Sequence, residues 1–325
     1  MRKALAVGID YYEHFNDLKG CALDAQRVHR LLERNSDRSV NFVQPKLVAA
    51  PDENHSITRG HLKDLIEELF NDKNEMALFY FSGHGYIKDK IGYLCTSDCK
   101  RGDDGLSMEE IILLAHASKT RNRILVFDCC HSGAAGSQPL VPTVSQLSDG
   151  MSVLTASTDQ QVAMATNRGS IFTNLFIDAL EGQAANLVGD ITPGSVYAHI
   201  DQSLGAWGQR PVFKTNVQSF VRLRKVNSAI PLGELHRITE FFPNAPFVHE
   251  LDPSYEPERS GDQAHLPPPN PANTAIFAIL QKMNRINLVV PVDAPHMYHA
   301  AMESKSCKLT ALGEHYRNLV SSKLV

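Results

Sequence analysis

Apolar and polar positions along residues 1–225 follow two alternating patterns. Short apolar runs with the character of buried strands occur at residues 3–9, 76–81, 123–127 and 152–156. Apolar residues recur at helical spacing at residues 62–70, 111–114, 171–180 and 193–204. Strands that alternate with helices predict an α/β fold, in which a mostly parallel sheet is covered by helices on both faces.

Two of these strands are followed by unusual polar sequences, at the sheet edge where binding and catalytic groups gather in such folds. The first continues into Ser-Gly-His-Gly at residues 82–85, where the two glycines allow the backbone beside His84 to turn sharply. The second continues into Asp-Cys-Cys-His-Ser-Gly at residues 128–133. Neighbouring parallel strands bring such ends side by side, and a thiol next to an imidazole forms a nucleophile with its base.

Each of these residues also has a simpler interpretation. A histidine after a strand is more often a hydrogen-bonding loop residue, and a buried cysteine is usually a small apolar side chain. A zinc site is disfavoured, because the chain has no Cys-x-x-Cys pair, and because Cys95 and Cys99 lack a second pair of that kind. The residues alone therefore leave both a catalytic and a structural role open.

Composition excludes several classes of protein. The 325 residues are 43% hydrophobic and 21% charged, which is typical of a globular chain rather than a disordered or fibrous one. A formal net charge of −4 argues against nucleic-acid binding by charge alone. No apolar stretch approaches the roughly 20 residues that cross a bilayer, and the basic start of the chain does not lead into a secretory signal. Six cysteines are too few for a disulfide scaffold, so we expect a cytoplasmic protein with reduced thiols.

Charge and proline content divide the chain into three parts. Residues 1–225 form the expected α/β domain. Residues 226–272 hold nine of the 17 prolines and carry a net charge of −5, which predicts an extended acidic linker. Phe241, Phe242 and Phe247 argue against a pure spacer, and the alternative is that they dock onto a neighbouring part. Residues 273–325 return to helical spacing at 276–283, with Asn273 or Thr274 as a cap, and at 312–320 after Thr310. This pattern predicts a small, mainly helical C-terminal module.

The two polar motifs together resemble those of the caspase-like cysteine peptidases, specifically the metacaspase and paracaspase branch. His84 precedes Cys130 by 46 residues, close to the separation of about 50 in caspases. Further segments at residues 20–25, 156–158, 169–173 and 209–211 support the resemblance, which covers about residues 3–224. It implies a caspase-like α/β/α sandwich for the first domain.

The resemblance also implies catalytic roles. It makes Cys130 the nucleophile and His84 the general base and acid, with the main-chain amides of Gly85 and Cys130 as the oxyanion hole. Cys129 falls where the family tolerates various residues. The family does not require a third, orienting side chain, and none is evident.

A specificity pocket follows from the same resemblance. Metacaspases select arginine or lysine before the scissile bond with an acidic pocket, and Asp24 and Asp128 match its acids. Cys21 and Ser82 fall at the remaining pocket positions. Two carboxylates can hold a guanidinium by charge-assisted bonds. Without the motifs, Asp24 would be interpreted as a solvated or capping residue of a helix and Asp128 as a strand end.

Many metacaspases require calcium, and the corresponding region here runs through Asp98 and residues 106–110. One of the paired acids of the family falls near Met108, and no acid lies between Cys130 and Val144. Because calcium takes six to eight oxygen ligands, we expect no metal and no other cofactor. Asp103 and Asp104 are an alternative ligand pair, with a solvated turn as the simpler interpretation.

Basic residues are absent from residues 124–167, so an enzyme that cuts after arginine or lysine cannot cut itself there. Self-cleavage is expected only in flexible segments, where the basic candidates are Lys88, Lys90, Lys100, Arg101, Arg237 and Arg259.

The sequence therefore predicts a cysteine endopeptidase acting on a protein substrate with a basic cleavage site, in regulated signalling, stress response or defence, including antiviral defence. The linker and C-terminal module are expected to contact a regulatory protein or an upstream activating protease, with no membrane contact. The end of that module also resembles the last helix of winged-helix modules, but its modest charge favours protein interaction over DNA binding. The alternative function is a non-catalytic caspase-like scaffold or regulator that binds through this module.

Overall fold

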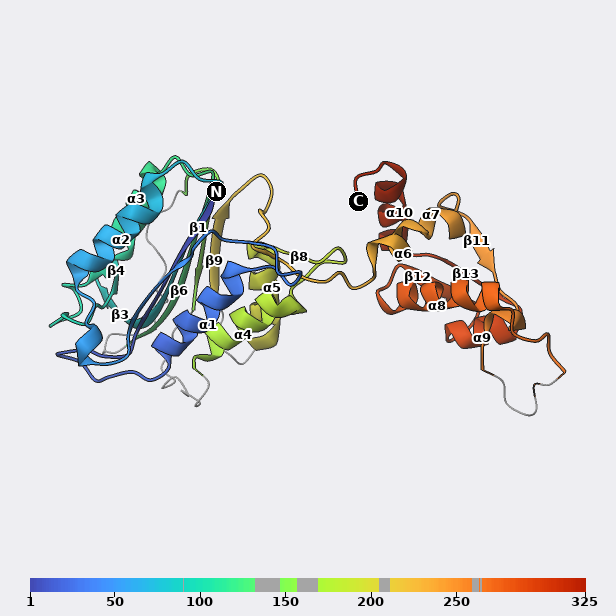
Figure 1. The fold of residues 1–325 in the computed structure, drawn as a ribbon, viewed down its shortest axis with the longest axis horizontal. Helices are drawn as coiled ribbons and strands as arrows, with labels where there is room; N and C mark the ends of the chain where they lie inside the picture. The colour runs from blue at the N-terminus through green and yellow to red at the C-terminus, as the bar shows by residue number, and fades with distance from the viewer. Residues whose placement is uncertain (90, 132–146, 157–168, 205–210, 259–262, 264) are drawn as a thin grey trace. The chain divides into compact units, whose positions relative to one another are not determined.

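A computed structural model of the chain describes residues 1–89, 91–131, 147–156, 169–204, 211–258, 263 and 265–325 (Figure 1). The chain folds as two compact units, Met1–Asn227 and Ser228–Val325. The first unit contains both polar motifs that the sequence singled out.

A mostly parallel sheet forms the centre of the first unit, with the strand order β2-β1-β3-β6-β7-β9. All neighbours in this order are parallel except β7 and β9, and two short antiparallel strands, β4 and β5, extend from β3. The strands are β1 (Arg2–Ile9), β2 (Lys46–Ala50), β3 (Met76–Lys88), β4 (Ile91–Leu94), β5 (Leu106–Ser107), β6 (Asn122–His131), β7 (Met151–Thr155) and β9 (Val212–Asn216).

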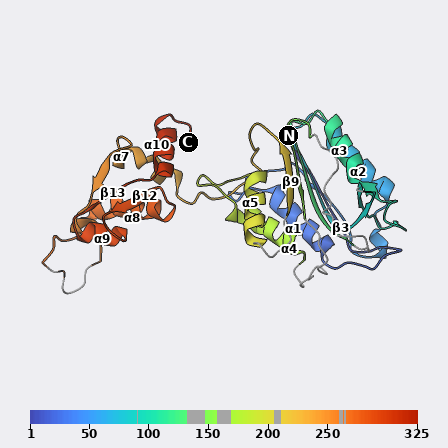
Figure 2. The same ribbon diagram turned by 180° about the vertical axis from the view of Figure 1, so that it is seen from behind.

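Helices cover both faces of this sheet, as Figures 1 and 2 show from opposite sides. One face carries α2 (Arg59–Asn71) and α3 (Met108–Ala117), and the other carries α1 (Cys21–Glu33), α4 (Ile171–Asp178) and α5 (Pro193–Leu204). The helical pattern predicted at residues 62–70 is the buried face of α2, and Ser107 caps α3. The predicted α/β/α sandwich is therefore confirmed.

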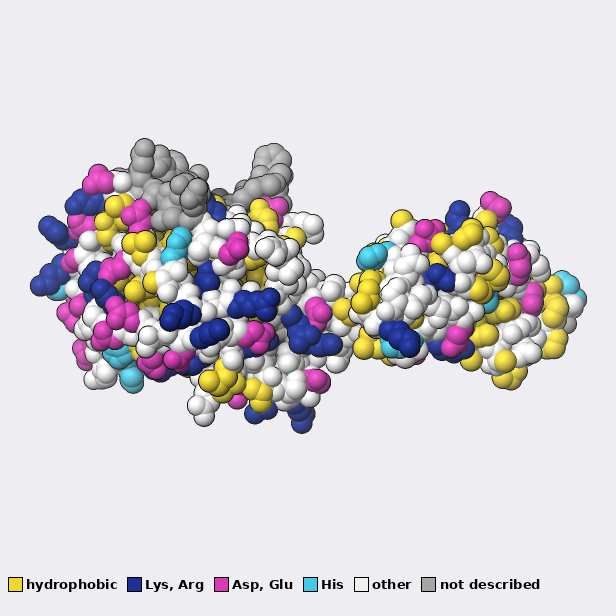
Figure 3. All heavy atoms as spheres, turned by 90° about the horizontal axis from the view of Figure 1, so that it is seen from above, with side chains coloured by type: hydrophobic (Ala, Val, Ile, Leu, Met, Phe, Trp, Pro, Cys, Tyr) yellow, Lys and Arg dark blue, Asp and Glu magenta, His cyan; other side chains and the backbone are white. Residues whose placement is uncertain are grey.

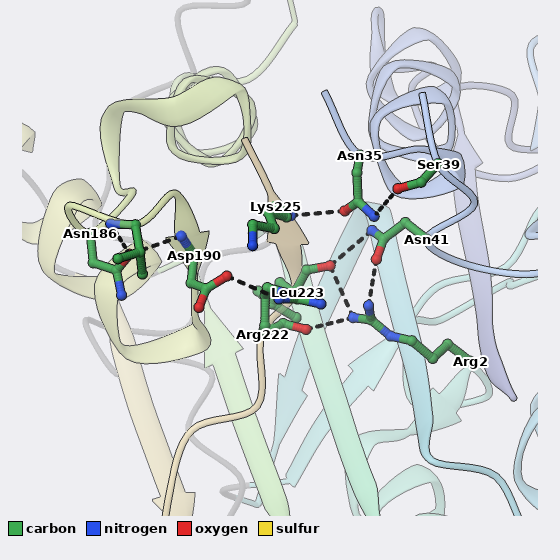
Figure 4. A network of polar contacts seen from close by, with 10 residues as sticks. Arg2, Asn35, Ser39, Asn41, Asn186, Asp190, Arg222, Leu223 and Lys225 are labelled. Atoms are coloured by element: carbon green, nitrogen blue, oxygen red, sulfur yellow. Dashed lines mark hydrogen bonds and ion pairs between the residues drawn. The ribbon is translucent and has the colours of Figure 1, made fainter. Parts of the chain in front are cut away.

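Short elements complete the first unit at its turns and at its end. They are η1 (Glu53–His55), the π-helical turn η2 (Ala179–Gln183), and the antiparallel pair β8 (Asp190–Ile191) and β10 (Arg224–Lys225). The guanidinium of Arg2 donates to Asn41 Oδ1 and to the carbonyl oxygens of Arg222 and Leu223, at 2.5, 2.6 and 3.0 Å (Figure 4). These bonds fix the last segment of the unit to the start of the central sheet.

The strands β3 and β6 differ from the prediction in their length. The sequence predicted ends at Phe81 and Phe127, but both strands continue through the polar motifs, to Lys88 and His131. The physical reason is that the main chain of both motifs still finds hydrogen-bonding partners in neighbouring strands. The strand β3 pairs with β6 as far as Gly85, and with β4 from Gly85 onward. Residues 82–85 and 128–131 therefore lie inside a hydrogen-bonded ladder rather than in turns, while Ser132 and Gly133 lie outside the described residues.

The register between β3 and β6 is fixed by side chains buried on both faces. Phe79 and Phe127 meet edge to face in one core, with ring centroids 6.0 Å apart. Tyr80 lies in the core on the opposite face, where its hydroxyl contacts Thr173 Oγ1 at 2.5 Å. A slip of one residue would move each ring to the wrong face, so this register is strongly specified.

The second unit contains the segment that the sequence assigned to an extended linker. Residues 228–258 are folded instead, with α6 (Leu232–His236), α7 (Ile238–Phe241), β11 (Val248–Glu250) and η3 (Pro253–Tyr255). The physical reason is that Phe241, Phe242 and Leu251 are buried, and that β11 pairs with β13. Proline and acidic residues therefore mark the surface and turns of this unit, not a spacer.

The remaining elements of the second unit are α8 (Pro271–Arg285), β12 (Val289–Val292), α9 (Met297–Met302), β13 (Ser306–Leu309) and α10 (Ala311–Ser321). The two helices predicted from spacing are α8 and α10, and Thr310 caps α10. The cap of α8 is Asn270, with Pro271 in the first turn, rather than Asn273 or Thr274. Pro291 lies in β12, which is an edge strand where a missing amide is tolerated.

Two surface properties bear on partners. Within the described ranges, none of the helices combines the length and apolar character needed to span a bilayer. Figure 3 shows lysine, arginine and acidic side chains interspersed over one face of the first unit. That face therefore presents no extended field of one sign.

Candidate active site

The two motifs meet through the backbone ladder between β3 and β6. His84 is the register partner of Cys130, and Gly83 is the partner of Cys129. Neighbouring strands lie about 4.8 Å apart, so positions 84 and 130 are adjacent despite their separation in sequence. Cys129 is buried in the core beneath α2 and α3. Because strand residues alternate between faces, Asp128 belongs to the opposite face.

The imidazole of His84 is held by main-chain and aromatic groups. Its Nε2 atom lies 2.8 Å from the carbonyl oxygen of Asn16, which accepts a hydrogen bond, so Nε2 carries the proton. The ring packs against Tyr12, with centroids 4.6 Å apart, and against Phe15 at 6.0 Å. The Tyr12 hydroxyl also accepts a hydrogen bond from the His84 amide at 2.7 Å.

The second ring nitrogen of His84, Nδ1, is available to accept a proton. Nδ1 is buried and has no hydrogen-bond partner among the described residues. Burial lowers the pKa of His84 below its usual value of 6.5, so the ring is neutral at physiological pH. A neutral ring protonated on Nε2 presents Nδ1 as a base.

The predicted oxyanion-hole residues lie beside this pair. Gly85 follows His84 in β3, and its register partners are Leu94 on one side and His131 on the other. The Cys95 amide donates to the carbonyl oxygen of His84 at 3.0 Å, which ties β3 to the chain after β4. The backbone that carries Gly85 is therefore fixed on both sides, and its role toward an oxyanion stays a prediction.

The two predicted pocket acids come together from different elements. Asp24 lies in the first turn of α1 and Asp128 near the end of β6, and both side chains are buried, with 1% and 4% of their surface exposed. Ser170, the N-cap of α4, contacts both of them. Its amide donates to Asp24 Oδ2 at 2.9 Å, and its hydroxyl donates to Asp128 Oδ2.

Burial shifts both acids toward their neutral forms, and like charge adds to this shift at Asp24. Burial, together with the charge of Asp128, raises the pKa of Asp24 to about 7, although the Ser170 amide opposes this effect. Burial also raises the pKa of Asp128, against the hydroxyls of Ser170 and Thr173. Asp24 Oδ1 accepts no hydrogen bond from the described residues, and the guanidinium of Arg27 lies 3.7 Å from it. The pair therefore has an open acceptor and too little countercharge.

The other two predicted pocket residues flank this pair. Ser82 is 2% exposed and is the register partner of Asp128 in β6. Cys21 begins α1, and its amide donates to Asp10 Oδ1 at 2.8 Å. Asp10 accepts from Ala22 as well, at 3.3 Å, so a carboxylate from the end of β1 satisfies the first amides of α1. This anchoring places Asp24 one turn into the helix, facing α4.

A hollow of about 590 Å³ opens between α1 and the edge strand β2. Gly20 and Gly169 form part of its wall, and Gly169 also packs against the carboxylate of Asp24. The hollow therefore reaches the rim of the acid pair.

The acids of the predicted calcium region already have partners within the chain. Asp98 Oδ1 accepts from Thr96 Oγ1 at 2.6 Å and from the Arg59 amide at 3.2 Å. Glu110 receives the Arg59 guanidinium and the Lys63 ammonium, each at 2.8 Å. Within the described part of the chain, no three metal-ligating side chains gather in one place. The described acids of this region do not form a donor set that fits calcium.

The alternative pair, Asp103 and Asp104, is also engaged. Asp103 forms an ion pair with Lys88, and Asp104 accepts hydrogen bonds from the amides of three residues, Lys100, Arg101 and Gly102. The interpretation as a capped turn therefore agrees with the contacts.

Sequence reasoning did not find the residues that support the site. Asn16 acts through its carbonyl oxygen, which carries no side-chain signal. Ser170 and Thr173 were noticed only as part of a family-like segment. Their sequence does show a helix start, but nothing in it points to Asp24 and Asp128.

Comparisons with known proteins agree on the first unit. A family model described as "Caspase domain" (Peptidase C14) matches residues 1–220. A metacaspase-1 from Meyerozyma guilliermondii is 27% identical over 164 residues, which cover 43% of this chain and 37% of that protein. A metacaspase-1 from Plasmodium berghei is 34% identical over 100 residues, covering 29% of this chain and 16% of that protein. The chain thus matches well under half the length of either relative.

Solved structures show a similar fold at low identity. A protein from Geobacter sulfurreducens aligns with a TM-score of 0.52 and 16% identity, over 70% of this chain and 100% of that one. Caspase-1 from Spodoptera frugiperda aligns with a TM-score of 0.51 and 10% identity, over 69% of this chain and 90% of that one. At such identities, the likeness concerns the fold alone.

Proposed function

The chain belongs to the caspase-domain family of peptidases, and we propose that it is a cysteine endopeptidase that cleaves proteins after arginine or lysine. The observation that carries this proposal is the register pairing of His84 with Cys130, together with the buried, unpartnered Nδ1 of His84. A neutral imidazole beside a thiol is the arrangement that generates a thiolate nucleophile.

The reaction would proceed in two stages. The Cys130 thiol transfers its proton to His84 Nδ1, and the thiolate attacks the carbonyl carbon of the scissile bond. In this proposal, the main-chain amides of Gly85 and Cys130 donate to the developing oxyanion, an effect worth roughly 3 kcal/mol per donor. The imidazolium then gives its proton to the leaving amine as the C–N bond breaks. Water, deprotonated by the same nitrogen, hydrolyses the thioester and restores the thiol.

Asp24 and Asp128 support the proposed specificity. Two buried carboxylates lack sufficient countercharge in the free protein, and a basic side chain of the substrate would supply it. A guanidinium can bond to both carboxylates in a bidentate manner. Cys21 and Ser82 complete the proposed pocket beside these acids. An acidic substrate side chain would meet like charge here and is not expected to bind.

Peptide hydrolysis tests the proposal directly. The full chain is incubated with fluorogenic peptides that differ only in the residue before the cleaved bond, which is arginine, lysine, aspartate or leucine. We expect cleavage after arginine and lysine only, complete loss in Cys130→Ala, and large increases in KM in Asp24→Asn and Asp128→Asn. The alkylation rate of Cys130 by iodoacetamide should survive both pocket substitutions. No activity above the Cys130→Ala background would favour a non-catalytic scaffold, and preference for aspartate would overturn the pocket.

The proposed function also bears on the compartment, the cofactor requirement and the partners of the protein. A free thiol nucleophile requires a reducing compartment, so we propose a cytosolic enzyme acting on a protein substrate without a metal or other cofactor. We also propose that the second unit binds a regulatory protein or an upstream activating protease. A role in signalling, stress response or defence would follow from the identity of the cleaved protein.

A further inference from the structure

We propose that Ser170 is a positioning residue that sets the selectivity of the acidic pocket for arginine over lysine. The proposal rests on the function proposed above and names a determinant of the same site. Ser170 touches both acids, although it lies 146 positions from Asp24 and 42 positions from Asp128 in the chain.

The contacts of Ser170 are divided between its main chain and its side chain. The amide nitrogen donates to Asp24 Oδ2 at 2.9 Å, and the hydroxyl donates to Asp128 Oδ2. The hydroxyl oxygen in turn accepts the Thr173 amide at 3.0 Å, as the cap of α4. Because this oxygen already receives one proton, its own proton is directed toward Asp128.

A second hydroxyl reinforces the position of Asp128. Thr173 Oγ1 donates to Asp128 Oδ2 at 2.5 Å and also contacts the Tyr80 hydroxyl at 2.5 Å. The first turn of α4 therefore supplies two donors to one carboxylate oxygen. Asp24 receives a single donor, the Ser170 amide, and its Oδ1 has no hydrogen-bond partner among the described residues.

This arrangement solves an electrostatic problem. Two carboxylates close enough to perturb each other repel when both are ionised, and repulsion alone would drive them apart. Ser170 donates one hydrogen bond to each carboxylate. Because both donors belong to one residue, they fix the separation of the two carboxylates. Asp24 Oδ1, which has no hydrogen-bond partner among the described residues, then has a defined position relative to Asp128.

A defined separation matters more for arginine than for lysine. The guanidinium is a rigid planar fork, whose paired bonds require acceptors at matching positions. The ammonium of lysine is a point charge on a flexible stem, so it tolerates displaced acceptors. Loosening Asp128 should therefore penalise arginine substrates more strongly.

The test is the substitution Ser170→Ala in the full chain. Alanine keeps the hydrogen bond from the main-chain N–H to Asp24 but removes the hydrogen bond from the hydroxyl to Asp128. We expect kcat/KM for the arginine peptide to fall about tenfold, mainly through KM, as for the loss of one hydrogen bond to a charged group. The ratio of arginine to lysine cleavage should fall with it. Ser170→Thr, which retains a hydroxyl and a cap, should restore both values.

A matched control separates this effect from the loss of a helix cap. Ser107 caps α3 with the same geometry, accepting the Glu110 amide at 3.1 Å, and its hydroxyl donates to no carboxylate among the described residues. Ser107→Ala and Ser170→Ala should lower the melting temperature by similar amounts, while only Ser170→Ala changes the arginine-to-lysine ratio.

The outcomes distinguish this inference from the proposed function. If the wild type cleaves after arginine and Ser170→Ala keeps its KM and its arginine-to-lysine ratio, the inference is wrong and the function stands. If Ser107→Ala changes the ratio as much as Ser170→Ala, the effect is one of helix stability and the inference also fails. If the wild type cleaves none of the peptides, the proposed function fails. Binding of benzamidine to Cys130→Ala, compared with the double variant Cys130→Ala/Ser170→Ala, then tests the pocket without catalysis, and weaker binding by the double variant supports the role of Ser170. Equal affinity for the two proteins would again overturn the role of Ser170.

Discussion

His84 Nε2 lies 2.8 Å from the main-chain carbonyl oxygen of Asn16, a group that reaches the ring from the loop before α1. A carbonyl oxygen only accepts, so this contact fixes the tautomer and leaves Nδ1 as the basic atom. A backbone group thus performs the orienting task that a third side chain performs in many nucleophile–base sites.

The first prediction separates the main chain of Asn16 from its side chain. Asn16→Ala keeps the carbonyl oxygen, so kcat should stay within about twofold of the wild type. His84→Ala removes the base and should lower kcat by about 10²- to 10⁴-fold. Steady-state hydrolysis of the arginine peptide measures both. A loss in Asn16→Ala comparable with that in His84→Ala would show that the asparagine side chain, not its carbonyl, holds the site.

The second prediction concerns pH. The pKa of Asp24 is raised to about 7 by burial and by the charge of Asp128. Below that pH the carboxyl is protonated and attracts a basic side chain weakly, so kcat/KM for the arginine peptide should rise as pH increases through about 7. His84 is already neutral there, because burial lowers its pKa below 6.5.

A matched measurement isolates Asp24 in this profile. Alkylation of Cys130 by iodoacetamide does not use the pocket, so its pH dependence should lack the step near 7. Asp24→Asn should remove the step from hydrolysis as well. A step that survives Asp24→Asn would have to be assigned to another group.

The third prediction uses Gly169. Its φ is +85°, and a Cβ atom built there would lie 2.0 Å from Asp24 Oδ1. Gly169→Ala should therefore lower the free energy of unfolding by more than about 1 kcal/mol and raise KM for the arginine peptide. Gly60→Ala is the control, because Gly60 lies in α2 with no neighbouring atom within 4 Å of the new Cβ. That substitution should stabilise the protein by up to about 1 kcal/mol. Urea denaturation compares the two, and equal effects would contradict the close packing at Asp24.

Much of the fold follows from local patterns in the sequence. Buried runs at 3–9, 76–81, 123–127 and 152–156 became β1, β3, β6 and β7, because apolar periodicity reports burial directly. The lengths of β3 and β6 did not follow, since the polar residues at 82–85 and 128–131 are held by main-chain pairing that composition does not encode. The folded state of residues 228–258 was missed for a related reason. Several of its apolar residues, such as Phe242 and Leu251, are buried, but the prolines and acids between them obscure their periodicity in the sequence.

The candidate site, like the fold, could be predicted from the sequence only in part. His84 and Cys130 could be named because their chemistry is rare and their motifs are distinctive. Asn16 and Ser170 could not, because their roles depend on where a carbonyl oxygen and an amide point after folding. Tertiary contacts between residues at least 42 positions apart decide both roles, and no local pattern carries that information.

The fourth prediction is that calcium has no effect on catalysis. Glu110 already binds two cationic groups of α2, Arg59 and Lys63, and Asp98 accepts the Arg59 amide. A calcium ion would have to displace these partners and find further oxygens. Hydrolysis rates should therefore agree within about twofold in a chelator and in millimolar calcium, the range of the weaker calcium sites. Activation by calcium in the wild type would show that this region rearranges to bind the metal.

The last prediction concerns self-cleavage. An enzyme that cuts only after arginine or lysine leaves residues 124–167 intact, because no basic residue occurs there. Elsewhere, Lys88 forms an ion pair with Asp103, and Arg237 joins α6 to α7 with its guanidinium 4.8 Å from the Phe241 ring centroid. The candidates Lys90 and Arg259 lie outside the described residues. Because these contacts hold Lys88 and Arg237 in folded elements, and Asp104 caps the turn at Lys100 and Arg101, cleavage there should be slow.

Intact-mass spectrometry of the wild type and Cys130→Ala should show that the full-length chain is the active species. A cut within 124–167 on which activity depends would overturn both the single-chain enzyme and its basic specificity, because the peptidase could make it only by cleaving after another type of residue.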